Sequence, residues 1–378
     1  MITTSEFWWE NITGPRNIIT SVIAALDNKQ MVLLKVPSDL PWRHTMRGVV
    51  ESNFRDRVMS GNLLIDIIDA VDDLKIEQDL GYYLLNKYAI DEDVRAGFRE
   101  GGKSTIQEYL IRNKVLRNRI IWIKGLSGKD AIRWIEFCKT YQIDSLEDGA
   151  FVLEVHGDLI AENEALAIVD YSDSVTFSDV QLFNTYLVDE ERSYSDKWKQ
   201  YISTMAAILC ETDAEVAEKI IQIGDFRNVE PIMILDKAAK LDMFERRGAD
   251  ERSSHILALT RSGKTEEINK RIWKTQIQIL FPVIELERVK LIDKWMINIQ
   301  DSLSNNHVTQ YGVHITNPYD VEIGTLDYLQ SHYSSGGGYK LYIPDETDRK
   351  RISFLHECRN LLAHVNCCAV CQVNKLLE

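Results

Sequence analysis

Cysteine is scarce in this chain and follows no pattern typical of a disulfide-rich secreted protein. The 378 residues include six cysteines: Cys138, Cys210, Cys358, Cys367, Cys368 and Cys371. Secreted folds that depend on disulfides carry a denser and more regular set, so we expect reduced thiols. Cys368 and Cys371 have the C-x2-C spacing of a zinc ligand pair, but no second well-spaced pair accompanies them. We therefore expect no metal.

Long apolar runs are also missing. No stretch approaches the roughly 18 uninterrupted apolar residues that a membrane-spanning helix needs. The first ten residues contain acidic side chains and no basic leader. Both absences predict a cytoplasmic protein with no membrane partner.

Positive charge is in deficit. The 44 lysines and arginines stand against 58 acidic residues, which gives a net charge of −14. Non-specific binding of nucleic acids needs a broad positive surface, so this balance argues against a wide electrostatic footprint and leaves room only for a local RNA site. The length suits two or three domains.

The first half of the chain alternates short apolar runs with amphipathic stretches. The apolar runs predict strands at 31–36, 119–123, 150–155 and 166–169. The amphipathic stretches predict helices at about 15–25, 42–58, 129–141 and 176–187. This alternation is typical of an α/β domain with a mostly parallel sheet, to which we assign residues 1–190. Residues 191–262 have a helical pattern and are assigned to a helical connector.

Three segments have either the sequence motif or the position of a phosphate-binding loop. Residues 97–104 match G-x4-G-K-[ST], but the charged residues before them do not form a buried strand. Gly263, Lys264 and Thr265 follow a predicted strand at 255–259, yet Ala258 replaces the first glycine that such a loop needs. A helix cap is the favoured interpretation there, and nucleotide binding by these three residues is the alternative.

The third segment, residues 37–45, follows the first predicted strand, where the topology would put a phosphate loop. It contains prolines and Asp39 and has no lysine at the start of the helix. The strand at 119–123 is followed by Lys124 instead of a magnesium-binding aspartate. Together these features resemble a P-loop ATPase that has lost its chemistry. The resemblance implies an ATPase-like scaffold or sensor, without ATPase activity or cofactor, that offers a site for a protein partner.

The most informative segment is Arg359-Asn360-Leu361-Leu362-Ala363-His364, inside a stretch at 348–378 that has no proline or glycine. One apolar helical face is formed by Leu355, Cys358, Leu362 and Val365. His356, Asn360 and His364 fall on another face. Because positions four apart are neighbours on a helix, Asn360 and His364 can address one ligand while Arg359 reaches it from beside them.

These side chains suit the cleavage of RNA without a metal. The reaction requires a base for the 2′-hydroxyl, an acid for the leaving 5′-oxygen and positive charge at the phosphorane-like transition state. An imidazole has an unperturbed pKa of about 6.5 and can fill the first two roles near neutrality. A guanidinium is always charged and binds phosphate oxygens bidentately.

An arginine, a polar residue and a histidine at this spacing, late in a helical region, resemble the R-x4-6-H motif of HEPN domains. The resemblance covers residues 263–378, where helices at about 272–295 and 321–326 precede the motif helix. It implies an all-α domain and an endoribonuclease of antiviral defence or of a toxin-like response. The active site of such an enzyme forms where the two motif helices of a homodimer face each other.

The resemblance also implies roles for single residues. His364 is the general acid and base, Arg359 holds and stabilises the phosphate, and Asn360 positions one or the other. Glu357, one helical turn earlier, is placed to tune His364.

A second interpretation stays open. The Arg-x4-His spacing occurs by chance in many helices, where the arginine is a solvated charge and the histidine a surface or core group. In that case the C-terminal domain is only a dimer interface, and the N-terminal domain docks a partner in a multi-protein defence complex. The glycine-rich segment at 335–338 is expected to be a flexible linker under both interpretations.

Overall fold

The computed structural model describes residues 2–57, 63–73, 79–99, 101–102, 104–156, 166–189, 193–248, 254–305 and 314–378. Contacts divide the chain into two compact units, Met1–Phe183 and Asn184–Glu378. Helix α9 (Phe177–Asp189) crosses this division. The residues predicted as a connector and as a C-terminal domain lie together in the second unit.

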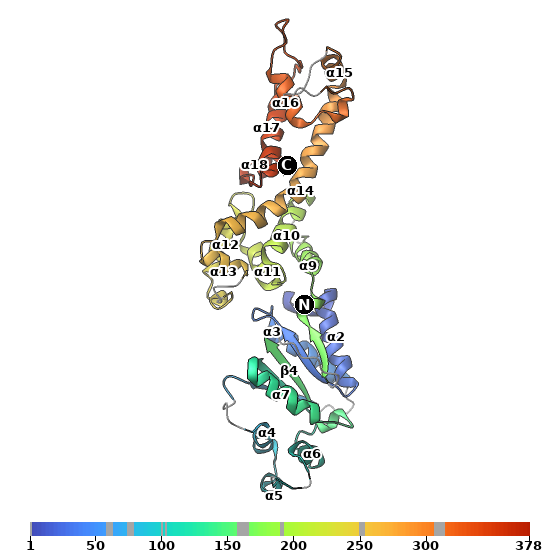
Figure 1. Cartoon of the computed structure of the whole chain (residues 1–378), viewed down its shortest axis with the longest axis vertical. Coiled ribbons are helices and arrows are strands. Elements are labelled where there is room, and N and C mark those ends of the chain that lie inside the picture. Colours follow the sequence, from blue (N-terminus) through green and yellow to red (C-terminus); the bar gives the residue numbers. More distant parts are fainter. Residues whose placement is uncertain are drawn as a thin grey trace. The chain divides into compact units, whose positions relative to one another are not determined.

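The first unit is built on a five-stranded parallel sheet (Figure 1). Its strands are β1 (Met31–Val36), β2 (Leu64–Asp69), β3 (Arg119–Leu126), β4 (Ala150–His156) and β5 (Leu166–Asp170), in the order β2-β3-β4-β1-β5. Strand β1 is interior, so that Leu33 pairs with Leu153 on one side and with Ile168 on the other. The continuous apolar runs of β1 and β4 reflect this burial.

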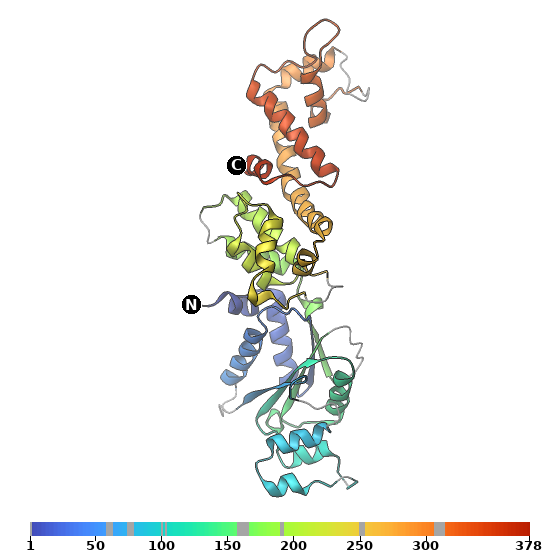
Figure 2. The same cartoon turned by 90° about the vertical axis from the view of Figure 1, so that its left-hand side faces the viewer.

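Helices cover both faces of the sheet (Figure 2). Helices α1 (Thr4–Asn11), α2 (Thr13–Asp27) and α3 (Arg43–Arg57) pack on one another, and α2 contacts β1 and β5. Helix α7 (Gly128–Thr140) packs on Phe151 of β4, whereas α3 reaches Glu154 of the same strand. Residues three apart on a strand point to opposite faces, so α3 and α7 lie on opposite sides of the sheet.

The predicted α/β fold followed by helices is confirmed, with one strand missed. Strand β2 lies at an edge, where Leu64 and Ile67 are about half exposed. Its sequence is interrupted by Asp66 and Asp69, so it lacks the continuous apolar run that reveals a buried strand. The remaining helices of this unit are α4 (Leu80–Tyr88), α5 (Glu92–Gly97), α6 (Ile106–Arg112) and α8 (Tyr171–Ser174).

The second unit consists of helices joined by loops, and among its described residues the β-structure is limited to one isolated bridge. It contains α10 (Asp196–Cys210), α11 (Ala214–Ile223), α12 (Pro231–Ala239), α13 (Ile256–Arg261), α14 (Thr265–Lys294), α15 (Met296–Ser304), α16 (Ile323–Ser331), α17 (Glu346–Ala363) and α18 (Val370–Leu377). The long helix α14 contacts α10, α17 and α18. In the part of the chain that the structure describes, no helix is both long and apolar enough to span a membrane.

Candidate functional site

The first unit has a topological switch point between β1 and β4. These strands are neighbours, yet the chain leaves β1 toward the β2 edge and leaves β4 toward β5. In parallel α/β sheets, ligands bind in the crevice that such a divergence opens at the carboxyl ends of the strands. The turn from β1 into α3, at residues 37–42, lies at this point.

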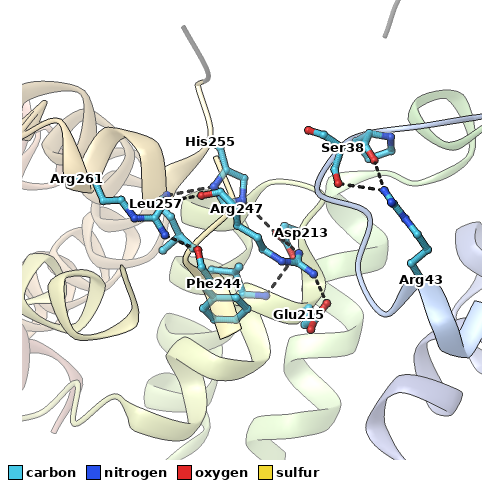
Figure 3. A network of polar contacts seen from close by, with 11 residues as sticks. Ser38, Arg43, Asp213, Glu215, Phe244, Arg247, His255, Leu257 and Arg261 are labelled. Atoms are coloured by element: carbon cyan, nitrogen blue, oxygen red, sulfur yellow. Dashed lines mark hydrogen bonds and ion pairs between the residues drawn. The ribbon is translucent and has the colours of Figure 1, made fainter. Parts of the chain in front are cut away.

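The side chain of Arg43 binds the backbone of this turn (Figure 3). Its Nη2 donates to the carbonyl oxygens of Ser38, at 3.0 Å, and Pro37, at 3.3 Å. A phosphate loop does the opposite, because it directs backbone N–H groups at an anion. The turn is therefore arranged around a cation that belongs to the protein.

A buried carboxylate completes this cluster. Glu154 is fully buried, and its Oε2 accepts hydrogen bonds from Arg47 Nη2 at 2.7 Å and from Trp122 Nε1 at 2.8 Å. Its Oε1 lies 3.3 Å from Arg43 Nε. A buried charge needs such pairing, and here the protein supplies it internally. The switch point is thus filled by an ion cluster.

Two other segments of the first unit are candidates for nucleotide binding. In one the key side chain is already paired within the protein, and the other does not follow a strand. Lys124 forms an ion pair with Asp69 and, with its hydrogen bond, holds the pKa of that carboxyl below its ordinary value. The segment 97–104 begins at the last residue of helix α5 and follows no strand. Glu100 and Lys103 lie outside the described residues.

Gly263, Lys264 and Thr265 form a junction between two helices, and the strand predicted at 255–259 is wrong. Those residues begin helix α13 instead. Gly263 has a φ of 67°, and its N–H donates to Thr260 O, while the Lys264 N–H donates to Leu259 O. This is the Schellman pattern that ends a helix. Both N–H groups are used internally, so the junction does not cradle a phosphate.

The second unit holds a buried ionic network around Asp213 (Figure 3). Asp213 ion-pairs with Arg247, accepts a hydrogen bond from His255 Nε2 at 3.1 Å and caps α11 through Val216 N. His255 Nδ1 accepts from Leu257 N, which places the imidazole proton on Nε2. Burial by itself raises the pKa of Asp213, but the His255 hydrogen bond and the Arg247 charge outweigh it and lower the pKa.

The predicted motif helix is present as α17. Asp345 caps it by accepting hydrogen bonds from the N–H groups of Thr347 and Asp348. Its buried face consists of Ile352, Leu355, Cys358 and Leu362. Val365 was expected on this face but is 51% exposed, because the helix ends at Ala363.

The end of α17 is a strained turn that contains the motif histidine. His364 is the C-cap, and Val365 follows with a φ of 60°. The N–H groups of Val365 and Asn366 donate to the carbonyl oxygens of Leu362 and Leu361, which is again the Schellman pattern. Glycine usually occupies the position of Val365, and a β-branched residue there is a genuine outlier.

Two side chains of α14 anchor this turn. Trp273 Nε1 donates to Leu362 O at 2.7 Å. The buried amide of Gln276 accepts from Cys368 N at 2.7 Å and donates to Cys368 O at 2.9 Å. The backbone on both sides of His364 is therefore tied to one helix, which fixes where the histidine emerges.

The motif residues lie at the surface with different partners. Arg359 Nη2 donates to Glu322 Oε2 at 3.2 Å, in a pair whose side chains are 33% and 70% exposed. The Asn360 amide bonds to His356 Nε2 at 2.8 Å, and His356 Nδ1 lies 2.8 Å from Asp327 Oδ2. The structure thus assembles a relay of Asp327, His356 and Asn360.

His364 stands apart from this relay. Its side chain is exposed, and Asn360 is directed to His356. Glu357, predicted to tune His364, accepts a hydrogen bond from Gln372 Nε2 at 2.9 Å. Within one chain the structure brings Asn360 together with His356, and does not join Arg359, Asn360 and His364 by the hydrogen bonds of their side chains.

Sequence reasoning assigned no role to His356, Asp327 or Glu322. The signal for His356 was its position four residues before Asn360 on the same helix. Asp327 lies in α16, and Glu322 is the residue just before that helix. No local sequence pattern indicates that either residue is near the motif, because α16 meets α17 only in the folded chain.

The cysteines near the motif are free thiols. Cys358 and Cys368 are buried, Cys367 is half-buried and Cys371 is exposed. Among the described residues, no group of three or more His, Cys, Asp or Glu side chains is arranged to hold a metal ion. Burial raises the pKa of Cys367 to about 11, which keeps it protonated near neutrality.

No protein-family model and no curated protein matches the chain. Among solved structures, the crystal structure of Cdc6p from Pyrobaculum aerophilum is similar over 93% of this chain and 87% of its own. The two share 14% sequence identity, and the TM-score is 0.34. A likeness at this level supports no conclusion about activity.

Proposed function

We propose that the second unit is a HEPN-like, metal-independent endoribonuclease that works as a homodimer. One observation carries the proposal: the last turn of α17 is fixed by buried contacts, yet it exposes the motif residues. The anchors are Trp273 and Gln276, and the side chains open to solvent are those of His364, which is exposed, and Arg359, which is half-buried. Groups held rigidly on an accessible surface are what a catalytic site requires.

The contact of Arg359 is weak enough to be exchanged for a phosphate. Exposed ion pairs such as Arg359 with Glu322 contribute only about 0–1 kcal/mol. A phosphate carries more charge than a carboxylate and accepts bidentate hydrogen bonds from a guanidinium. RNA that reaches Arg359 would therefore displace Glu322.

Two copies of His364 would supply the acid and the base. General acid–base cleavage uses one group to remove the 2′-hydroxyl proton and one to protonate the leaving oxygen. Each chain brings one His364 to its motif, so a dimer with facing motif helices provides both roles. Arg359 of each copy would stabilise the charge that develops on the phosphorane.

Asn360 would act as a positioning residue. Its Nδ2 donates to His356 Nε2, so that Nδ1 of His356 carries the proton that bonds to Asp327. Burial raises the pKa of Asp327, but hydrogen bonds from Ser353 and His356 outweigh this and lower it. The charged Asp327 orients His356, which orients the amide of Asn360 beside Arg359.

We infer that the first unit regulates this activity as a pseudo-ATPase domain. The ion cluster of Arg43, Arg47 and Glu154 occupies the place where a nucleotide would bind. Such a domain would serve as a scaffold or sensor for a protein partner. Antiviral defence or a toxin-like response is the setting that fits a ribonuclease under such control.

The test is cleavage of a mixed RNA pool, with EDTA present, by wild type and by Arg359→Ala and His364→Ala proteins. We expect cleavage by wild type and its loss in both variants, with unchanged dimer mass. His44→Ala removes an exposed histidine of the first unit and is the matched control. Equal cleavage by wild type and His364→Ala would contradict the proposal. No cleavage by any protein would favour a non-catalytic dimerisation subunit.

A further inference from the structure

An exposed pair of stacked tyrosines stands between α16 and α17. The rings of Tyr333 and Tyr339 lie 4.6 Å apart at an angle of 22°. They are 62% and 47% exposed. The two stacked rings form one contiguous exposed patch, and such a patch is a candidate binding surface. Their segment projects from the helices as a loop (Figure 2).

The segment is an ordered turn, and the flexible linker expected at 335–338 is its tip. Tyr333 and Tyr339 form an antiparallel bridge, and Lys340 N donates to His332 O at 2.8 Å. Ser334 N donates to Gly338 O at 2.7 Å, and Gly337 takes a φ of 90° that favours glycine. The backbone thus holds the two rings in register, so little ordering cost remains for a ligand.

A groove leads from these rings toward the motif. A hollow of about 610 Å³ runs along α17. It is lined by Gln330, Ser331, Tyr339, Arg349, Lys350, Ser353, Phe354 and Glu357. Glu357 and His364 are seven positions, or two helical turns, apart and so lie on one face of α17, whereas Arg359, two positions from Glu357, lies on the other side of the helix. A chain bound in the groove would therefore approach His364.

The charges along the groove favour weak contacts with phosphates. Lys350 pairs with Glu346, but both side chains are about 70% exposed or more, so the pair is easily exchanged. Lys340, the residue after Tyr339, places its Nζ 4.7 Å from the ring centre of Tyr328. Acidic groups such as Glu346 and Glu357 offset these cations, so stacking must supply most of the affinity.

We propose that the Tyr333–Tyr339 pair and the groove along α17 bind single-stranded RNA and guide it to His364. The inference rests on the proposed ribonuclease function and names the surface that holds its substrate. Bases stack on aromatic rings without regard to sequence, and cations near them contact the backbone. A stable protein partner would need a larger interface than this small groove, whose surface is about half polar, offers.

The experiment measures binding of a fluorescein-labelled eight-nucleotide 2′-O-methyl RNA. This probe lacks the 2′-hydroxyl nucleophile, so binding is separated from cleavage. Tyr333→Ala/Tyr339→Ala should bind at least about tenfold more weakly than wild type, because each stacked base contributes substantially. Tyr333→Phe/Tyr339→Phe keeps both rings and should retain binding. Tyr186→Ala, which removes an exposed tyrosine elsewhere, is the matched control.

Three other results would overturn the inference. These are no binding by wild type, equal binding by the double-alanine protein, and a change in the oligomeric mass of that protein. The last result would assign the surface to a second copy of the chain. Tyrosine-dependent binding by a wild type that cuts no RNA would refute only the ribonuclease. Retained binding by His364→Ala would show that binding and chemistry are separate.

Discussion

Two single residues in the second unit have environments that their side chains do not favour. Val365 holds a left-handed backbone conformation, which costs an L-residue about 1–2 kcal/mol. Asp213 is a charged group with 4% exposure, and it is stable there because Arg247 and His255 pair with it. The first residue stores strain beside the motif histidine, and the second links stability to pH.

Val365→Gly should stabilise the second unit. Glycine adopts the left-handed conformation without a steric cost, and the exposed valine side chain contributes little packing. We expect a gain of about 1 kcal/mol in the free energy of unfolding, measured by urea denaturation. Val365→Ala keeps a Cβ in the strained conformation and should gain much less. A loss of stability in Val365→Gly would show that the conformation is not strained.

Asp213→Asn should destabilise the second unit in a pH-dependent way. The folded-state pKa of Asp213 is lowered, so its carboxylate adds stability above the ordinary carboxyl pKa of about 3.9. This stability is lost as the pH falls through the pKa of Asp213 in the folded state. We expect the variant to lose about 3 kcal/mol at pH 7, because Arg247 loses a buried partner.

The control for this experiment is Asp242→Asn, which changes an exposed aspartate. Denaturation curves from pH 7 to pH 3 should show the difference between wild type and Asp213→Asn shrinking below about pH 4. A difference that stays constant over this range would mean that the carboxylate charge is not what stabilises the fold.

Among the helices, the contact of α14 with the end of α17 decides where the motif lies. Gln276 replaces the missing backbone partners of Cys368, because its amide both donates and accepts there. Trp273 adds a third bond from the same helix, to Leu362. Helix α14 therefore holds the turn that contains His364 in place.

Gln276→Met keeps the volume of the side chain and removes both hydrogen bonds to Cys368. The buried N–H and carbonyl of Cys368 would then be unpaired, which costs about 1–3 kcal/mol for each group. We expect a loss of about 3 kcal/mol in thermal or urea denaturation, together with weaker RNA cleavage. Gln222→Met changes a glutamine whose side chain bonds only to other exposed side chains, and it should leave both unchanged.

At the scale of the whole molecule, the chain combines a parallel α/β unit with a helical unit. The switch point of the sheet is the place where such folds bind nucleotides, and here Arg43 faces carbonyl oxygens at that place. The junction at Gly263 has its N–H groups bonded within the chain. Among the described residues, the turn at 37–42 and the junction at Gly263 therefore form no cradle of N–H groups for a phosphate.

We expect no binding of magnesium ATP, measured by isothermal titration calorimetry at millimolar nucleotide. Arg43 and the Gly263 junction leave no N–H cradle for phosphates, so Lys264→Ala should change nothing. Binding by wild type that is lost in Lys264→Ala would contradict this expectation. Binding that is lost only in Lys103→Ala would assign the nucleotide to the segment 97–104 instead.

The sequence alone was sufficient for much of the fold. Continuous apolar runs identified β1, β3 and β4, because interior strands of a parallel sheet are buried on both faces and carry few polar residues. The run at 166–169 also identified β5, although this strand lies at an edge. The apolar periodicity of α17 and its cap at Asp345 are likewise local properties. Short apolar runs are ambiguous, however, and 255–259 became helix α13 through its packing on α12.

Tertiary structure decided the surroundings of the motif. Glu322 and Asp327 lie more than 25 residues before Arg359 and His356, so no local pattern indicates these pairs. Gln276 reaches Cys368 across 92 positions of sequence. The sequence fixes which side chains are available and on which helical face they lie, because both depend on neighbours along the chain. Their partners depend on which helices pack together, and only the folded chain determines that.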